Sequence, residues 1–423
     1  MDKKLPSDAS RRRATVFALV VAFLDSIGAG LIIPVVPLLI EEVGHMDLGD
    51  AARIGGTLFA LYSLTLFACA PLLGQLSDRF GRRPLLLLAV GGLALDYVLQ
   101  AWAPTLGWLF LGRFIAGLCG ASIVIANACL ADVSTRETRA RAFGLMSAAF
   151  GLGFVLGPAL GGVLGEFGTR VPFWTAAGLA GINFLFGLVF LPETLMADAR
   201  RAFYWRDANP FGVFRVFLRF PGVLPYAGIL ALYFLGSSVY IGVWAFWGFA
   251  KFDWTGTIVG LTLATAGLSM ALLQGFGTGP AVARFGEHRL ALIGLAVAAL
   301  SCVGFGLLSS TLFVFVLLVV HAVEGFVHPT LSAIMSKGLP EDSQGTLQGG
   351  IAAVQSLSAL IGTVVFTQVF SYFMSPHALI QSPDVAFFLA GGILAFAFAM
   401  LILLIIRHHA SDKANPIEGM RIP

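Results

Sequence analysis

Charge is scarce in this chain of 423 residues, since only 12% of them are Asp, Glu, Lys or Arg while 58% are hydrophobic. A soluble protein typically carries about 25% charged residues. Apolar runs long enough to cross a bilayer recur along almost the whole sequence. Because so much apolar surface could not be hidden from water, the composition excludes a soluble protein. It predicts an all-α membrane protein whose surroundings are a lipid bilayer.

Cysteine is also scarce, with 4 residues in the chain. The sequence lacks the loop Gly-x-x-x-x-Gly-Lys-Ser/Thr that binds nucleotide phosphates. The missing loop argues against ATP as an energy source. The cysteines lie inside apolar runs without metal-ligand spacing, so we interpret them as free, buried thiols: Cys69, Cys119, Cys129 and Cys302. We therefore expect no cofactor, no bound metal and no nucleic-acid partner.

A cleavable signal peptide is not indicated at the basic N-terminus. The apolar run 14–40 is too long for one, it contains Asp25, Pro34 and Pro37, and no small-residue cleavage site follows it. We expect this run to remain as the first membrane span.

Apolar segments between charge clusters predict twelve spans, with boundaries uncertain by about four residues. They are 15–40, 54–77, 84–104, 106–131, 141–165, 171–192, 223–249, 256–282, 289–309, 311–335, 346–372 and 385–406. The charged stretch 193–222 separates six spans from six, and its phenylalanines have helical spacing. This spacing predicts an amphipathic helix on the membrane surface.

The distribution of positive charge orients these spans. With the N-terminus in the cytoplasm, the cytoplasmic segments hold 22 of the 26 lysines and arginines. The outer loops then hold three of them, Arg53, Arg170 and Lys251, and Arg113 lies within a span. Because positive residues collect on the cytoplasmic side, both termini are predicted to be cytoplasmic. The chain is then a multi-pass protein of the plasma membrane, which in bacteria is the inner membrane.

An internal repeat relates the two sets of six spans. The segment Gly74–Gly81 reads GQLSDRFG, and Gly279–Gly286, 205 residues later, reads GPAVARFG. The repeat predicts an N-terminal half at 1–192, a cytoplasmic linker at 193–222 and a C-terminal half at 223–423. Two halves in the same orientation are related by an axis along the membrane normal, with a substrate site near the bilayer midplane between them.

Three motifs carry a resemblance to a known family. The run Gly74-x-x-x-Asp78-Arg79-x-Gly81-Arg82-Arg83-Pro84 follows the second span. The fifth span contains the run Gly151-x-Gly153-x-x-x-Gly157-Pro158-x-x-Gly161-Gly162. The first span contains Leu24-Asp25 followed by Gly28, Gly30, Pro34 and Pro37. Together they resemble the major facilitator superfamily, and within it the tetracycline/H⁺ antiporters, which also have Asp-Tyr and Gly-Arg where this chain has Asp96-Tyr97 and Gly112-Arg113.

This resemblance implies a major facilitator fold with twelve transmembrane helices in two pseudo-symmetric six-helix halves. It implies a proton-coupled exporter that works by alternating access, with Arg113 in the proton linkage. It assigns an antiporter motif to the fifth span, namely Gly153, Gly157, Pro158 and Gly161. It also assigns a cytoplasmic gate that holds the outward-facing state, formed by Gly74, Asp78, Arg79, Gly81, Arg82 and Arg83.

Ionisable side chains inside spans support the same function independently. An ionised Asp25 some ten residues into a span costs several kcal/mol unless it is paired or hydrated, so this carboxylate could take up a proton. A proton-coupled carrier needs such a site, which protons and substrate occupy in alternation. Arg113 must face the cavity or a partner acid. It could keep a nearby acid ionised in one conformation of the transporter and release it in the other. Asp96 is a second proton site, a substrate contact or a structural acid. Ion pairing that only stabilises the bundle remains the alternative for all three.

The second half departs from the tetracycline antiporters, which carry a histidine in the eighth helix and an aspartate in the ninth. This chain has neither there, and instead has His321, Glu324 and His328 in the tenth span. At i, i+3 and i+7 these three side chains share one helix face. They could form a second coupling site, contact substrate, bind a metal or metal-chelated compound, or be a self-satisfied polar cluster.

Other residues are candidates for the substrate cavity, namely Tyr233, Tyr240 and Gln274. The two tyrosines are seven residues apart and could stack on a flat organic ligand, although aromatic residues in such spans usually form the interfacial belt. The sequence thus predicts a monomeric secondary transporter, not an enzyme, that exports a drug-like or tetracycline-like compound in exchange for protons. The alternatives are a proton-coupled transporter of a metabolite or metal-chelated compound on the same fold, an intramembrane enzyme, and a non-transporting receptor.

Overall fold

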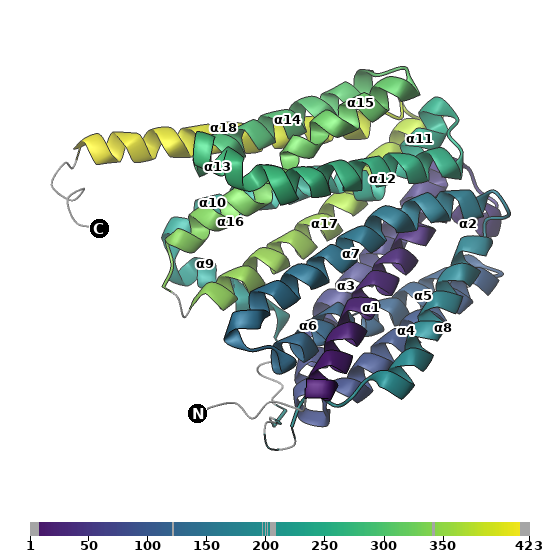
Figure 1. The fold of residues 1–423 in the computed structure, drawn as a ribbon. Helices are drawn as coiled ribbons and strands as arrows, with labels where there is room; N and C mark the ends of the chain where they lie inside the picture. The colour runs from purple at the N-terminus through teal and green to yellow at the C-terminus, as the bar shows by residue number, and fades with distance from the viewer. Residues whose placement is uncertain are drawn as a thin grey trace.

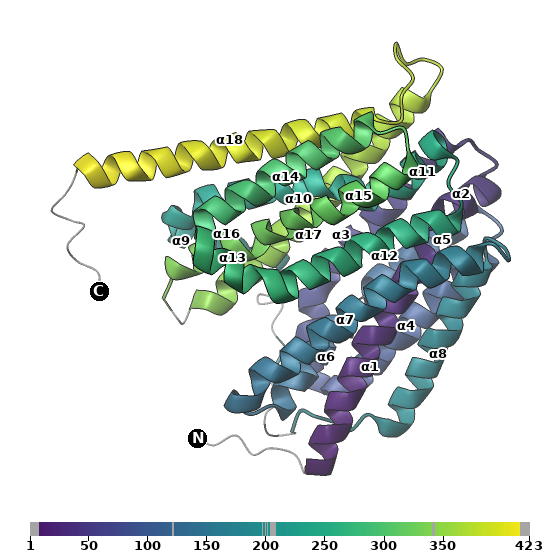
Figure 2. The ribbon, with the colours of Figure 1, turned by 45° about the horizontal axis from the view of Figure 1, so that its top comes forward.

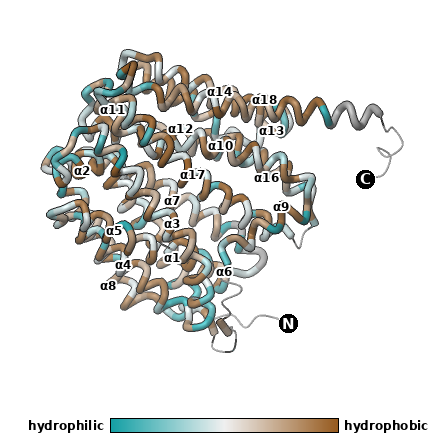
Figure 3. Tube along the Cα trace, turned by 180° about the vertical axis from the view of Figure 1, so that it is seen from behind, coloured by the Kyte–Doolittle hydropathy of each residue, from teal (hydrophilic) through white to brown (hydrophobic). Residues whose placement is uncertain are grey.

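The computed structural model describes residues 8–120, 122–196, 198, 200, 202–203, 209–340 and 343–414. Within these ranges the chain is helical and has no β-strand (Figure 1). Twelve described helices are long and apolar enough to cross a membrane, as predicted. Their apolar residues run along the helices, and hydrophilic residues gather at the ends (Figure 3). Large side chains such as Leu300, Leu307 and Leu312 are about 70% exposed, which suits contact with lipid.

The first bundle contains eight helices, some of which are two parts of one span. They are α1 (Asp8–Ile32), α2 (Val36–Gly44), α3 (Leu48–Phe80), α4 (Arg82–Trp102), α5 (Leu106–Cys119), α6 (Ser122–Val133), α7 (Arg136–Gly165) and α8 (Val171–Phe190).

The second bundle contains α10 (Leu224–Gly242), α11 (Trp244–Phe252), α12 (Gly256–Leu272), α13 (Thr278–Phe285), α14 (Glu287–Leu307), α15 (Thr311–His321), α16 (Val327–Lys337), α17 (Gln344–Met374) and α18 (Val385–Ala414). A π-helical turn, Leu273–Gly277, joins α12 to α13, and a 3₁₀ turn, Ala322–Phe326, joins α15 to α16. The eighth and tenth spans therefore each depart from α-helical geometry partway along.

Two predicted spans are too long. The first was expected at 15–40, but α1 ends at Ile32 and α2 begins at Val36. Pro34 and Pro37 lack the N–H groups that would continue the helix, and Pro37 lies in the first turn of α2, where proline is tolerated. The seventh was expected at 223–249, but α10 ends at Gly242 and α11 follows as a separate short helix.

The linker was predicted to carry an amphipathic helix on the membrane surface, and the described part is different. It forms a 3₁₀ turn, Pro210–Phe214, and the five-residue helix α9, Arg215–Arg219. Val216 and Phe217 are buried against Gly350 of α17, and the Phe211 ring lies 5.5 Å from the Phe67 ring of α3. This segment therefore lies against both bundles. Arg201, Arg206 and Asp207 lie outside the described residues.

The two bundles meet along α3–α17 and α7–α12. In Figure 2 they converge at the end that carries α2 and α11 and diverge toward the chain termini. The contacts at the converging end are very close: a Cβ on Gly162 would lie 2.3 Å from the Gly256 carbonyl oxygen, and one on Gly260 would lie 2.2 Å from the Pro158 oxygen. A Cβ on Gly56 would lie 1.9 Å from Thr367. We call these three glycine contacts the outer seam, since this end is extracellular in the predicted orientation.

Candidate functional site

Asp25 lies inside the first bundle. Its carboxylate accepts hydrogen bonds from Ser122 Oγ of α6 at 2.7 Å and from Asn183 Nδ2 of α8 at 3.4 Å. Asn183 is fully buried, whereas Asp25 is half-buried. The acid therefore faces the helices of its own bundle, and both of its hydrogen-bond donors are neutral.

Asp96 has a different environment. It is fully buried, pairs with Arg113 of α5 and accepts a hydrogen bond from Gln100 Nε2 at 2.7 Å. The Arg113 guanidinium also lies over the Tyr62 ring, 5.7 Å from its centre. Gly112 makes room for this pair, since a Cβ there would lie 2.7 Å from Asp96 Oδ1. Arg113 thus has its partner acid, and that partner is Asp96 rather than Asp25.

The glycines of the fifth span pack backbone against backbone on α1. A Cβ on Gly157 would lie 2.7 Å from the Ile27 oxygen, and one on Gly161 would lie 2.1 Å from the Leu31 oxygen. Gly153 similarly meets the Phe23 oxygen. These positions recur every four residues and therefore lie on one helix face. Because Gly162 and the Pro158 oxygen contact α12, the motif joins the Asp25 helix to the other bundle.

The loop after the second span contains a network of ion pairs. Arg82 pairs with Asp78 at 2.6 Å and with Asp132, at the end of α6, at 3.1 Å. Gly81 has φ +107°, a conformation that favours glycine, and a Cβ there would lie 2.3 Å from Glu193 Oε2. Glu193 accepts hydrogen bonds from the backbone N–H groups of Arg82 at 2.9 Å and Arg83 at 3.3 Å.

Sequence analysis missed two members of this network. Asp132 could have been found as an acid at the end of the fourth span, and Glu193 as an acid directly after the sixth. The other predicted gate residues have separate contacts. The Arg79 guanidinium lies over Phe80, and Arg83 also donates to the Leu188 oxygen at 2.7 Å. A Cβ on Gly74 would meet no heavy atom within 4 Å.

The predicted trio of the tenth span has two sets of contacts. His321 Nε2 lies 3.3 Å from Glu324 Oε1, but the ring of His328 packs on Phe234 instead. The 3₁₀ turn at 322–326 lies between His321 and His328. All three side chains face α10, where Tyr233 and Tyr240 approach the pair and Phe234 packs on His328, so one shared face stays a prediction. Within the described part of the chain, no three His, Cys, Asp or Glu side chains gather as metal ligands would.

Two of the three predicted cavity residues lie in the interior of the second bundle. Tyr233 is 6% exposed, and Tyr240 packs on His321 with ring centres 4.6 Å apart. Gln274, in contrast, is exposed, and its amide donates to the Gly325 oxygen at 3.0 Å. It lies on the π-helical turn after α12, where its side chain contacts the 3₁₀ turn of the tenth span. Substrate contact by any of the three stays a prediction.

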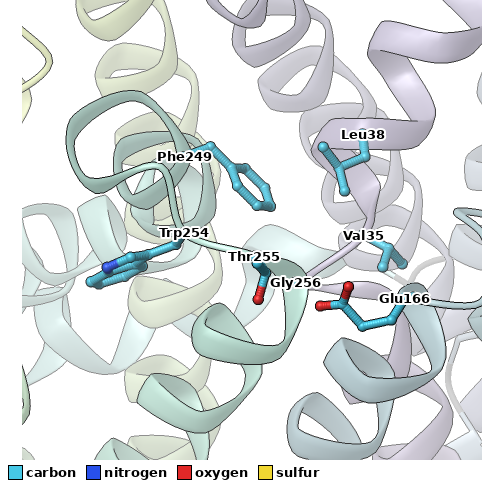
Figure 4. A pocket seen from close by; sticks show the side chains of 8 residues that line it. Val35, Leu38, Glu166, Phe249, Trp254, Thr255 and Gly256 are labelled. Carbon is cyan, nitrogen blue, oxygen red and sulfur yellow. The ribbon is translucent and has the colours of Figure 1, made fainter.

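A pocket of about 190 Å³ lies at the outer end between the bundles. Figure 4 shows Phe249 and Thr255 of the second bundle facing Val35 and Glu166 of the first. Sites for drug-sized ligands typically measure about 300–1,000 Å³. Since Glu166 also accepts a hydrogen bond from Thr257 at 3.0 Å, we interpret this space as part of the closed outer end.

Comparison with known proteins places these features in a family. The sequence profile described as Major Facilitator Superfamily matches residues 18–363 and 227–421. The class C tetracycline resistance protein of Escherichia coli is 40% identical over 361 residues, covering 85% of this chain and 90% of that protein. The class H tetracycline resistance protein of Pasteurella multocida is 31% identical and covers 96% and 98%. The solved human organic anion transporter MFSD10 has 24% identity and a TM-score of 0.67, covering 92% and 99%, which shows a shared fold. The chain therefore belongs to the major facilitator superfamily and is similar to the tetracycline resistance proteins over most of its length.

Proposed function

We propose that this protein exports tetracycline-like or other drug-like compounds in exchange for protons, with Asp25 as the proton carrier of the first bundle. The proposal is supported by relatives that are named as tetracycline resistance proteins, at 31–40% identity over most of the chain. More distant relatives, such as a multidrug resistance protein of Bacillus subtilis at 25% identity, are also named for drug resistance.

The observation that carries the proposal is the contrast between two carboxylates. Asp96 has a cation, Arg113, as its partner, so it stays balanced as an anion inside the bundle. Asp25 has only Ser122 and Asn183, which donate hydrogen bonds but bring no charge. An anion in such a place is costly, so Asp25 is the group for which gaining and losing a proton changes the energy of the bundle most. A carrier needs such a group to exchange protons in each cycle.

Alternating access would then come from rocking of the two bundles. The outer seam consists of glycine contacts that small displacements would open, and the Arg82 network lies at the opposite end of the first bundle. One proton crossing about 100 mV supplies about 2.3 kcal/mol, which supports a gradient of roughly fifty-fold. We propose that the Arg113–Asp96 pair changes partners during this motion and that Asp78 and Arg82 act in the cytoplasmic gate.

The remaining features of the proposal come from charge and composition. Both termini are cytoplasmic, because 22 of the 26 basic residues then lie on that side. The protein acts as a monomer without a catalytic step. Its two halves divide at the linker 193–222.

Everted membrane vesicles test the proposal. Vesicles with wild-type protein should accumulate tetracycline when energised, and a protonophore should abolish this uptake. Asp25→Asn should remove the protonophore-sensitive part completely, since amide and carboxylate have the same shape but the amide takes up no proton. The matched control is Asp50→Asn, which changes an exposed aspartate paired with Arg53 at the outer end of α3; its uptake should equal that of wild type.

The proposal fails if Asp25→Asn, present at the wild-type level, retains uptake that the protonophore abolishes. Absence of uptake by wild type for tetracycline and for a panel of cationic drugs would reject drug export itself.

A further inference from the structure

A second pair of titratable side chains lies buried in the other bundle. His321 and Glu324 are 5% and 3% exposed, and their side chains approach to 3.3 Å. Each also retains a buried polar atom without a hydrogen-bond partner, His321 Nδ1 and Glu324 Oε2. Buried polar atoms are nearly always satisfied in proteins, so each of these two side chains keeps one buried atom that can still form a hydrogen bond.

The backbone brings the pair together. α15 ends at His321, and the next five residues form the 3₁₀ turn. Side chains at i and i+3 eclipse each other in 3₁₀ geometry, which puts Glu324 directly beside His321. Gly325 fits this turn against the neighbouring span, since a Cβ there would lie 2.9 Å from Gln274 Nε2.

The groups that face this pair from neighbouring helices are neutral. Tyr233 and Tyr240 approach Glu324 from α10, and Cys302 approaches from α14, with its sulfur 3.0 Å from the Tyr240 hydroxyl. Phe305 of α14 covers the imidazole, with ring centres 5.8 Å apart. In the described part of the chain no lysine or arginine pairs with Glu324, so a charge on either member can be balanced only by the other.

We propose that His321 and Glu324 form a second proton-binding site, in which the two side chains hold one proton in common. Their burial leaves no room for a drug, and the two do not make the three-ligand set that a metal site would need. A proton is small enough to enter during the opening motion. Coupled groups at this distance titrate as one unit, so the pair gains and loses a single proton. This adds a site in the second bundle to the proposed function, which itself rests on Asp25.

The pair is linked to the neighbouring eighth span through Gln274. The amide of this exposed residue, on the π-helical turn, donates to the carbonyl of Gly325 within the 3₁₀ turn. Two irregular turns in neighbouring spans are therefore linked by a side-chain hydrogen bond. A change of bonding at Glu324 alters the turn that holds the Gly325 carbonyl, and through it the position of Gln274.

Proton uptake by purified, detergent-solubilised protein tests the site without any drug. The pH of a weakly buffered sample is lowered from about 9 to about 5.5, the range around histidine titration, and the protons bound per molecule are counted. Glu324→Gln should bind one proton fewer than wild type, because a lone buried imidazolium would have no counter-charge. His321→Gln should take up its proton at a lower pH than wild type, because the carboxyl then holds the proton without the imidazole that shares it. The matched control is Glu42→Gln, which removes an exposed carboxylate that Thr169 and Arg170 keep ionised in this range, so its count should equal that of wild type.

The proton measurements distinguish a pair that only stabilises the fold from a pair that binds a proton. If Glu324→Gln and His321→Gln are folded, as shown by a single symmetric peak in size-exclusion chromatography, and both give the wild-type curve of protons bound against pH, the inference is overturned. If only one variant folds, its curve decides. Asp25 is intact in both variants, so a negative result with them would reject only the second proton site. The proposed function is tested separately, by drug uptake into vesicles that carry Asp25→Asn.

Discussion

The two bundles have the same turn after their second membrane span, but the charges around this turn have opposite signs. Gly81 and Gly286, 205 residues apart, both have positive φ, +107° and +74°. The same offset relates Arg82 to Glu287 and Asp132 to Lys337. In the first bundle Arg82 pairs with Asp132 at 3.1 Å, and in the second Glu287 pairs with Lys337 at 2.7 Å. The ion pair is retained between the same two spans, with its signs exchanged.

Helix dipoles make this exchange consequential. Glu287 lies at the N-terminus of α14 and Lys337 at the C-terminus of α16, where each charge is favoured. Arg82 lies at the N-terminus of α4 and Asp132 near the C-terminus of α6, where each is disfavoured. The Glu193 carboxylate, bonded to the first N–H groups of α4, supplies the negative charge that this N-terminus lacks. The first bundle therefore depends on a network where the second has a simple pair.

The repeat therefore keeps the positions of this ion pair, but the sign of the charge at each position differs between the two bundles. Proton-linked candidates in the first bundle, Asp25 and Asp96, lie on regular helices. The proposed proton site of the second bundle, His321 and Glu324, does not occupy the repeat positions of these two acids and lies at a helix irregularity. The same architecture thus holds two chemically different sites.

The largest effect should come from copying the second bundle into the first at the antiporter motif. Gly161 corresponds to Phe366 at the 205-residue offset. Gly161→Phe should abolish folded protein, because even its Cβ would lie 2.1 Å from the Leu31 oxygen, and overpacking by far smaller groups already costs about 1–3 kcal/mol. Yield and monodispersity in detergent measure this. Gly151→Ala, where a Cβ meets nothing within 4 Å, is the control and should behave as wild type.

A smaller effect is expected from charge reversal in the two ion pairs. Arg82→Glu should lower thermal stability strongly, since Arg82 and Asp132 are each 11% exposed and breaking a buried pair costs about 3–5 kcal/mol. Glu287→Arg should cost less than about 1 kcal/mol, because Lys337 is 70% exposed and can turn into solvent. The triple change Asp78→Ala/Arg82→Glu/Asp132→Lys, which copies the second bundle, should recover part of the loss. Equal melting temperatures for the two single variants would contradict the asymmetry.

The smallest effect concerns the outer ends. Glu42 is bonded by Thr169 and Arg170, while in the second bundle the more buried Lys251 pairs with Asp384 at 2.8 Å. The hydrogen bond from Thr169, followed by those from Arg170, lowers the pKa of Glu42, despite an opposing contribution from burial. Its stabilisation is therefore present above the unfolded value of about 4.3 and is lost as the pH falls through the lower folded value.

Glu42→Gln should accordingly lower the melting temperature slightly at neutral pH, by an amount worth less than about 1 kcal/mol for so exposed a pair. Wild type and variant should melt together in stronger acid. A difference that grew as the pH fell would refute the assigned sign.

Much of the site could be predicted from sequence because single residues were out of place in hydrocarbon. Asp25, Asp96 and Arg113 are conspicuous as charges in apolar runs, and the glycines at intervals of four in the fifth span indicated one close-packed face. Partners were harder to predict. That Arg113 pairs with Asp96 and leaves Asp25 to Ser122 and Asn183 depends on how five helices pack, which no local pattern records.

The sequence by itself determined the twelve spans, the repeat and the membrane environment, because length, hydropathy and charge act locally along the chain. Only the tertiary structure decided where helices break within a span and which polar groups meet. The 3₁₀ turn at 322–326 set Glu324 beside His321, and Gln274 from a neighbouring span bonds that turn. Such departures from α geometry are small in energy, so contacts with other helices, rather than local sequence, select them.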